Sequence, residues 1–144
     1  MNYVLMFVFD FHMRNVLMMK RDKPPYAGCL NGIGGKIEEQ DTNPLHAIYR
    51  EMMEETGLEY GDVIEVKPLV RESYPSGNVV YVFYGRQGAH AGKPQQKDEG
   101  TLIWYPADEL TDVRDPRLAG EGNTAYFINA ARIAEAAQAG EGAE

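Results

Sequence analysis

Three glutamates at helical spacing are the residues in this sequence best suited to chemistry. At about 100° per residue, Glu51, Glu54 and Glu55 would share an arc of roughly 100° on a helix, opposite its apolar stripe. Like charges at this spacing cost about 0.2–0.5 kcal/mol per pair, and acidic groups in a last helical turn oppose the helix dipole. The cluster is therefore either a solvated face, which water can screen, or a site that binds a cation.

Glycines just before this helix favour the cation. Gly32, Gly34 and Gly35 lie close together, where the backbone is expected to turn sharply or to approach a ligand closely. Magnesium takes oxygen ligands, including carboxylates and backbone carbonyls, and usually also contacts a substrate phosphate. A glycine corner beside three carboxylates can supply both ligand types. We therefore expect a Mg²⁺ site, with Mn²⁺ as a substitute, that acts on a phosphate-containing substrate.

A helix over residues 44–56 must carry these glutamates. Asn43 is a good N-cap, Pro44 suits the first helical position, and Gly57 suits the position just past the end. The residues predicted to face inward recur at helical spacing and are Leu45, Ile48, Tyr49, Met52 and Thr56.

The other elements are predicted to be strands and one further helix. Strands are expected at residues 3–9, 15–20, 63–70, 79–85 and 102–105, with a tight turn near His12 and Met13 and loops over residues 21–30 and 87–100. A last helix is expected over residues 124–137. We expect one α/β domain over residues 1–138, with a mixed β-sheet covered by helices, and a frayed tail over residues 139–144.

Composition excludes several classes of function. The net charge of −8 argues against binding to a nucleic-acid polymer, which usually needs a basic face. No stretch approaches the ~20 apolar residues that span a bilayer, and the apolar start lacks the features of a signal peptide. Cys29, the single cysteine, excludes an internal disulfide and a multi-cysteine zinc site. We therefore expect a cytoplasmic protein without a membrane partner.

The segment from the glycines to the end of this helix resembles the Nudix box, G-x5-E-x7-R-E-U-x-E-E-x-G-U, in which U is a bulky aliphatic residue. The residues that match it are Gly35, Arg50, Glu51, Met52, Glu54, Glu55, Gly57 and Leu58. Asp41 stands where the box has its first glutamate, and eight residues rather than seven separate Asp41 from Arg50. The resemblance implies an α/β/α sandwich and hydrolysis of a diphosphate linkage in a small nucleotide.

The resemblance also implies roles for the residues of the box. Glu51, Glu54 and Glu55 would bind divalent metal together with the carbonyl of Gly35, and Arg50 would orient a glutamate through a salt bridge. The alternative for Arg50 is a surface pair worth about 0–1 kcal/mol.

A further glutamate is expected shortly before the strand that contains Trp104. Glu99 fits that place as a metal ligand or as the catalytic base, with Asp98 as an alternative and an ordinary loop carboxylate as the other interpretation. The expected catalytic set is thus Glu51, Glu54, Glu99 and Arg50.

The segment 31–36 resembles Nudix members that hydrolyse oxidised purine nucleoside triphosphates, in which an asparagine at the place of Asn31 hydrogen-bonds the base. Asn31 could instead cap a turn. Lys36 could reach a phosphate, and Arg21 and Tyr26 are further candidates for contact with the substrate. A second tryptophan followed by paired aspartates, which would clamp a base, is missing here.

Three functions stay open at this point. The first is hydrolysis of a nucleoside triphosphate to a monophosphate and pyrophosphate. The second is hydrolysis of a nucleoside diphosphate derivative such as ADP-ribose or a nucleotide sugar. The third, of another class, is a sensor that binds nucleotides without cutting them, although such domains usually lack box glutamates. Many relatives form homodimers, and a homodimer is therefore a further expectation.

Overall fold

The computed structural model describes residues 1–24, 26–98 and 100–142. Its strands are β1 (Asn2–Phe9), β2 (Asn15–Arg21), β3 (Leu30–Asn31), β4 (Ile33–Lys36), β5 (Val63–Ser73), β6 (Val79–Gln87) and β7 (Gly100–Pro106). Its helices are α1 (Pro44–Thr56) and α2 (Asn123–Gly142), and two short 3-10 turns are η1 (Tyr60–Asp62) and η2 (Ala107–Leu110).

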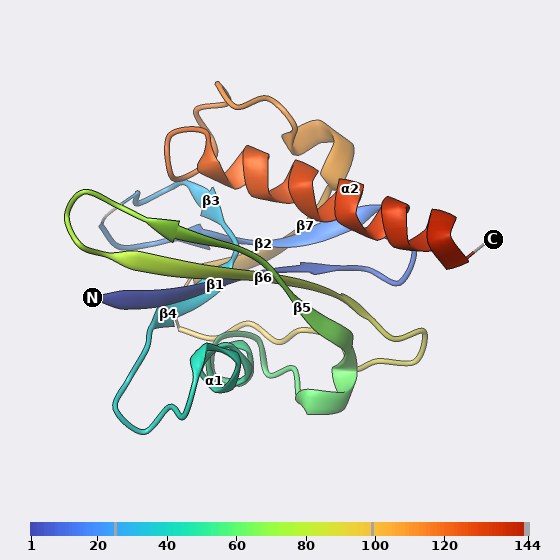
Figure 1. The fold of residues 1–144 in the computed structure, drawn as a ribbon, viewed down its shortest axis with the longest axis horizontal. Helices are drawn as coiled ribbons and strands as arrows, with labels where there is room; N and C mark the ends of the chain where they lie inside the picture. Colours follow the sequence, from blue (N-terminus) through green and yellow to red (C-terminus); the bar gives the residue numbers. More distant parts are fainter. Residues whose placement is uncertain (25, 99, 143–144) are drawn as a thin grey trace.

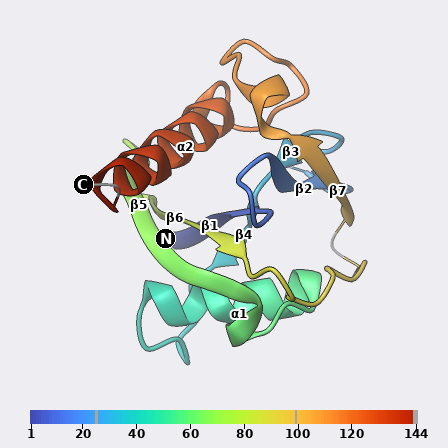
Figure 2. The same cartoon turned by 90° about the vertical axis from the view of Figure 1, so that its right-hand side faces the viewer.

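The sheet is mixed, as the sequence predicts, and β1 lies at its centre. The main order is β3-β2-β1-β6-β5, with β4 paired to β1 and β7 paired to β2. β1 and β6 run parallel over eight residue pairs, whereas β1 is antiparallel to both β2 and β4. Figures 1 and 2 show α1 below this sheet and α2 above it, which is the predicted α/β/α arrangement.

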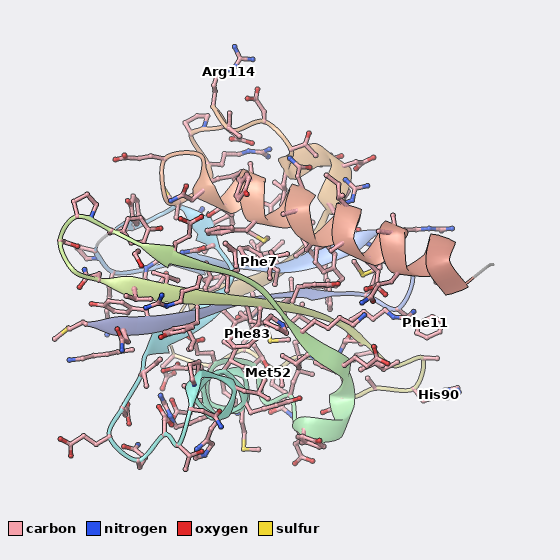
Figure 3. The ribbon with its side chains drawn as sticks, viewed as in Figure 1. Phe7, Phe11, Met52, Phe83, His90 and Arg114 are labelled. Atoms are coloured by element: carbon pink, nitrogen blue, oxygen red, sulfur yellow. The ribbon has the colours of Figure 1, made fainter. Side chains whose placement is uncertain are left out.

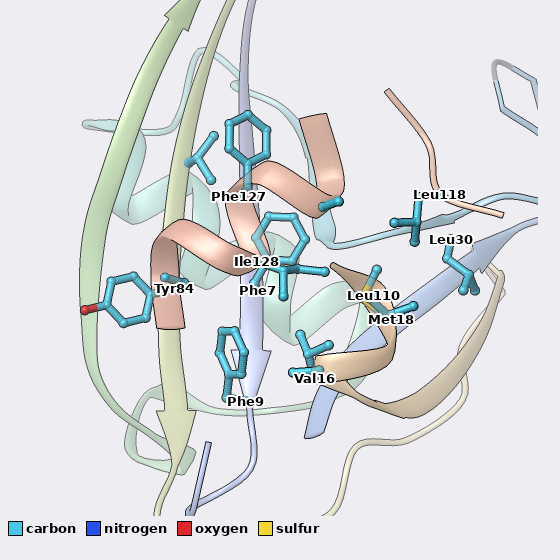
Figure 4. Close-up of a cluster of buried hydrophobic side chains, with 14 residues drawn as sticks. Phe7, Phe9, Val16, Met18, Leu30, Tyr84, Leu110, Leu118, Phe127 and Ile128 are labelled. Atoms are coloured by element: carbon cyan, nitrogen blue, oxygen red, sulfur yellow. The ribbon is translucent and has the colours of Figure 1, made fainter. Parts of the chain in front are cut away.

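Two apolar clusters hold the three layers together. On the α2 side, the rings of Phe7 and Phe127 meet with centroids 6.2 Å apart, and Ile128 lies in the same cluster (Figure 4). On the α1 side, Met52 and Phe83 share the other cluster, between the helix and the sheet (Figure 3). Burying side chains of this size contributes about 1.5–3 kcal/mol each.

The predicted limits of α1 are confirmed. The Asn43 side chain accepts a hydrogen bond from the His46 amide at 2.8 Å, Pro44 begins the helix, and Gly57 ends it with φ of 74°. One inward-facing prediction is wrong, because Leu45 is 40% exposed while Ile48 and Met52 are fully buried. Leu45 lies in the first turn of α1 and belongs to neither apolar cluster of the described residues, so the sheet does not cover it.

Two other predictions differ from the structure. Residues 30–36 hold two short strands, β3 and β4, where the sequence predicts a loop end and then glycines that either turn sharply or approach a ligand closely. α2 ends at Gly142, later than the predicted residue 137. Gln138 and Ala139 are good helix formers and continue the helix past its predicted end. Within the described part of the chain, no helix is both long and apolar enough to span a membrane.

Candidate functional site

The three glutamates of α1 are not equally placed. Glu51 and Glu55 are buried, at 9% and 5% exposure, whereas the Glu54 side chain is 57% exposed. The prediction that all three lie on a face opposite the apolar stripe is therefore wrong. Glu51 and Glu55 lie beside the apolar stripe, and their side chains face β4. Glu54 lies on the solvent-exposed side of the helix.

The glycines of β4 make this approach possible. The Gly34 amide donates a hydrogen bond to Glu55 Oε2 at 2.9 Å. A Cβ atom added to Gly35 would lie 2.4 Å from Glu51 Oε1, and one added to Gly34 would lie 2.1 Å from the Val4 carbonyl oxygen. Both distances are shorter than real contacts allow. The glycines therefore let an extended strand pack closely against β1 and α1, and their predicted approach to a ligand stays a prediction.

Arg50 links the carboxylates of this site. Its Nε and Nη2 atoms each donate to Asp41 at 2.9 Å, a bidentate pair. Its Nη1 atom donates to Glu51 and to Glu54, each at 3.1 Å, and its Nη2 atom also donates to the Lys36 carbonyl oxygen at 3.1 Å. The Arg50 side chain is only 14% exposed and that of Asp41 is 0% exposed. Both side chains are therefore largely shielded from solvent, unlike the exposed surface pair that was the alternative interpretation of Arg50.

Asp41 therefore has a clear structural place despite the extra residue before α1. The Glu38 amide donates to its Oδ2 atom at 2.8 Å, so the carboxylate closes the loop between β4 and the helix. The hydrogen bonds from Arg50 lower the pKa of Asp41 to about 2, against the opposing effect of burial. Burial raises the pKa of Glu51, and the neighbouring Arg50 charge partly offsets that rise.

The lowered pKa of Asp41 predicts how an Asp41→Asn variant behaves in acid. In the unfolded chain this carboxyl group titrates near the ordinary aspartate pKa of 3.8. The free energy that the ionised Asp41 contributes to folding is therefore fully present above that pH, and it is lost as pH falls through about 2. We expect Asp41→Asn to be less stable than the wild type by a constant amount between about pH 7 and 5, with the difference shrinking below about pH 4. Urea unfolding across this range measures it, and a difference that grows in acid would contradict it.

A cavity of about 660 Å³ lies on the α2 side of β4. It places three predicted substrate residues, Arg21, Tyr26 and Asn31, around one space. The other lining residues are Tyr3, Val4, Leu5, Gly32, Gly34, Gly35, Tyr74, Ser76, Asn78, Val80, Gly120, Glu121, Asn123, Thr124 and Phe127. Gly34 and Gly35 thus line the cavity on one side and contact Glu55 and Glu51 on the other.

Lys36 lies apart from Arg21, Tyr26 and Asn31. Lys36 is exposed at the end of β4 and lies outside the lining that the described residues give this cavity. Glu99, expected as a metal ligand or base, lies outside the described residues, and its alternative Asp98 is exposed.

The donor set suits a hard dication. Glu51, Glu54 and Glu55 offer only oxygen atoms, and the Gly35 backbone lies directly against Glu51. As these side chains stand, the described residues hold no ready cluster of three His, Cys, Asp or Glu groups, and Arg50 engages Glu51 and Glu54. A cation at this place would have to draw the exposed Glu54 carboxylate toward the other two.

The sequence profile of the NUDIX domain matches residues 1–126, which is most of the chain. The chain belongs to the Nudix family. A Mycobacterium tuberculosis protein named as a candidate "8-oxo-dGTP diphosphatase 2" is 33% identical over 99 residues, which are 68% of this chain and 69% of that protein. This Nudix protein is thus a pyrophosphohydrolase of small nucleotides, and its family generally uses divalent metal ions.

Solved structures agree on the Nudix fold. The NUDIX domain of Shewanella oneidensis NrtR, complexed with ADP ribose, superposes with a TM-score of 0.70 at 20% identity, over 92% of this chain and 86% of that one. A MutT NUDIX hydrolase from Burkholderia pseudomallei superposes with a TM-score of 0.64 at 21% identity, over 90% and 97% of the two chains.

Sequence reasoning missed one whole wall of the cavity. Tyr74, Ser76 and Asn78 come from the β5–β6 hairpin, and Glu121 and Asn123 come from the segment that leads into α2. No motif marks these residues. Glycines at positions 77, 120 and 122 indicate exposed loops. They do not indicate that these loops lie beside each other in the folded chain.

Proposed function

We propose that this Nudix enzyme hydrolyses a purine nucleoside triphosphate, with oxidised purines as the favoured group, to a nucleoside monophosphate and pyrophosphate, and that Mg²⁺ is its metal. The observation that carries this proposal is the cavity of about 660 Å³, which runs from Asn31 to the glycines beside Glu51 and Glu55. A base at Asn31 would leave its phosphates near these carboxylates. The named activity of the M. tuberculosis relative supports the same substrate class.

Glu51, Glu54 and Glu55, with the Gly35 carbonyl, would hold the cation. Bound there, a dication neutralises phosphate charge, lowers the pKa of a water molecule and aligns the reacting oxygens. Among the protein's own groups, Arg50 keeps the Glu51 and Glu54 carboxylates side by side through its Nη1 atom. A glutamate of this cluster, or Glu99, accepts the proton of the attacking water. Lys36, exposed beside the site, is available to the outermost phosphate.

Asn31 is the residue proposed to contact the base. Its Oδ1 atom accepts a hydrogen bond from the Gly32 amide at 2.8 Å and lies 3.4 Å from the Thr124 hydroxyl, which makes a shorter bond of 2.7 Å to the Ala119 carbonyl. These contacts use the oxygen and fix the orientation of the amide group. The Nδ2 group can then donate to an acceptor such as a purine ring nitrogen or carbonyl.

A substrate panel tests the proposal. It contains canonical and oxidised triphosphates, ADP-ribose, dinucleotides and nucleotide sugars. We expect the highest kcat/KM with a purine triphosphate, and pyrophosphate rather than orthophosphate as the second product. A clear preference for ADP-ribose or a nucleotide sugar would replace the proposal with hydrolysis of a nucleoside diphosphate derivative, and equal rates on all compounds would refute any narrow assignment.

Metal removal is a separate test. Because the carboxylates alone leave the phosphate charge unneutralised, we expect a chelator to lower turnover by at least about 10³-fold. Added Mg²⁺ should restore it, with Mn²⁺ as a partial substitute. Turnover that persists after exhaustive chelation would show that hydrolysis proceeds without these ions.

A further inference from the structure

The wall of the cavity that faces away from the glutamates is built from two loops that are distant in sequence. The β5–β6 hairpin contributes Tyr74, and the loop between β2 and β3 contributes Tyr26. Figure 1 shows the hairpin, this loop and the start of α2 at the same end of the molecule. Both tyrosines line the same space as Asn31, the residue proposed to contact the base.

The hairpin holds Tyr74 in a defined position. The Tyr74 amide donates to the Asn78 carbonyl at 2.9 Å, and the Gly77 amide donates to the Tyr74 carbonyl at 2.9 Å. Gly77 takes the left-handed conformation that such a turn requires, with φ of 92°. The Tyr74 backbone is therefore fixed at the base of a closed turn.

A second segment fixes the Tyr74 side chain. The Asn123 Nδ2 group donates a hydrogen bond to the Tyr74 hydroxyl at 3.2 Å. Asn123 begins α2 after three successive left-handed residues, Gly120, Glu121 and Gly122, with φ of 80°, 53° and 104°. Glu121 carries a Cβ atom, which makes a positive φ unfavourable, so the backbone of this turn is strained. Such strain persists where the surrounding structure imposes it.

Tyr26 is strained in the same way. Its φ of 63° is uncommon for a bulky residue, and its side chain lines the cavity although the residue is 44% exposed. The Cys29 amide donates to the Tyr26 carbonyl at 3.0 Å and so closes the turn. Burial and the nearby Glu72 carboxylate raise the pKa of the Tyr74 phenol, and the hydrogen bond from Asn123 partly offsets that rise. Tyr26 and Tyr74 thus line one cavity from two segments that are distant in the chain.

We propose that Tyr26 and Tyr74 together bind the flat face of the substrate's base, and that Asn123 is a positioning residue that holds the Tyr74 ring through its hydroxyl. This inference rests on the proposed function and adds how the enzyme distinguishes a nucleotide from a phosphate compound without a base. Phosphate contacts are shared by all such compounds, but aromatic stacking requires a planar ring.

Binding of two probes, measured by calorimetry, tests this role. Guanosine monophosphate carries a base, and ribose 5-phosphate does not. We expect Tyr74→Ala to weaken binding of the nucleotide about 10–100-fold, the range of losses for removal of one stacking ring. Binding of ribose 5-phosphate should change less than about twofold, because this probe has no ring to stack. Tyr74→Leu, which keeps apolar bulk in the hairpin, should show the same pattern if the alanine variant does not fold. Tyr60→Ala is the control, because Tyr60 is 75% exposed on η1 and lies outside the cavity lining.

The positioning role of Asn123 has its own readout. Asn123→Ala and Tyr74→Phe remove the same hydrogen bond, so each should raise KM about 2–5-fold with little change in kcat, and the double variant should be no worse than either single variant.

Wild-type affinity of Tyr74→Leu for the nucleotide, or an equal loss for both probes, would overturn the inference. So would a wild-type protein that does not bind the nucleotide. If the wild type hydrolyses no triphosphate, the proposed function fails, whatever Tyr74 does.

Discussion

Glu55→Gln is expected to lower kcat by at least about 10²–10⁴-fold while leaving the fold intact. Glutamine keeps the shape of the side chain and an oxygen that can accept from the Gly34 amide, the contact that now holds Glu55 at 2.9 Å. It removes the negative charge that a dication needs. Glu54→Gln should behave alike, because Glu54 is the exposed carboxylate that can move toward the other two.

Glu39→Gln is the matched control, because Glu39 is an exposed glutamate in the loop before α1. Turnover of the best panel substrate, thermal unfolding and Mn²⁺ affinity should be measured on all three variants. We expect normal thermal unfolding in each, and weaker Mn²⁺ binding only in the two α1 variants. Near-normal kcat in both α1 variants would remove these glutamates from the mechanism.

Arg50→Ala is expected to cost about 3–5 kcal/mol of unfolding free energy, a large share of the stability of a small domain. The Asp41 side chain is fully enclosed and would lose its bidentate partner. Glu51 would lose its cation as well, so that two enclosed carboxylates would lose their positive partner, although the Glu38 amide would still donate to Asp41. Urea unfolding at neutral pH measures the loss.

Arg50→Lys separates charge from geometry. Lysine keeps the charge but cannot form the planar pair with Asp41 while also reaching Glu51 and Glu54, so we expect an intermediate loss. Arg114→Ala is the control, because Arg114 is 87% exposed and pairs with the exposed Asp112. Exposed pairs contribute little. Equal stability of Arg50→Ala and Arg114→Ala would show that the network around Arg50 is not structural.

The sequence predicts α1 well because its limits are local. Asn43, Pro44 and Gly57 specify the ends through their own backbone preferences, and the structure confirms each of them. β4 is different, because Ile33–Lys36 is rich in glycine, which is weak in strands and common in turns. Its extended form comes from pairing with residues 3–6 of β1. A single sequence cannot show such pairing.

The candidate site, like the fold, could be predicted from the sequence only in part. The box glutamates are visible as a pattern, but the burial of Glu51 and Glu55 depends on how closely β4 approaches α1. Asp41 departs from the box in residue type and spacing, yet the loop absorbs the inserted residue and the carboxylate still meets Arg50. The cavity joins segments far apart in the chain, so only the tertiary structure could place Tyr74 and Tyr26 around one space.

Successive side chains of β1 lie on opposite faces of the sheet. Tyr3 and Leu5 line the cavity, Met6 and Val8 belong to the apolar cluster beneath α1, and Val4 belongs to both. Positions 3 and 5 can therefore vary without disturbing positions 6 and 8. In such a strand, substrate preference can drift in evolution, or be redesigned in the laboratory, while the hydrolytic machinery stays unchanged.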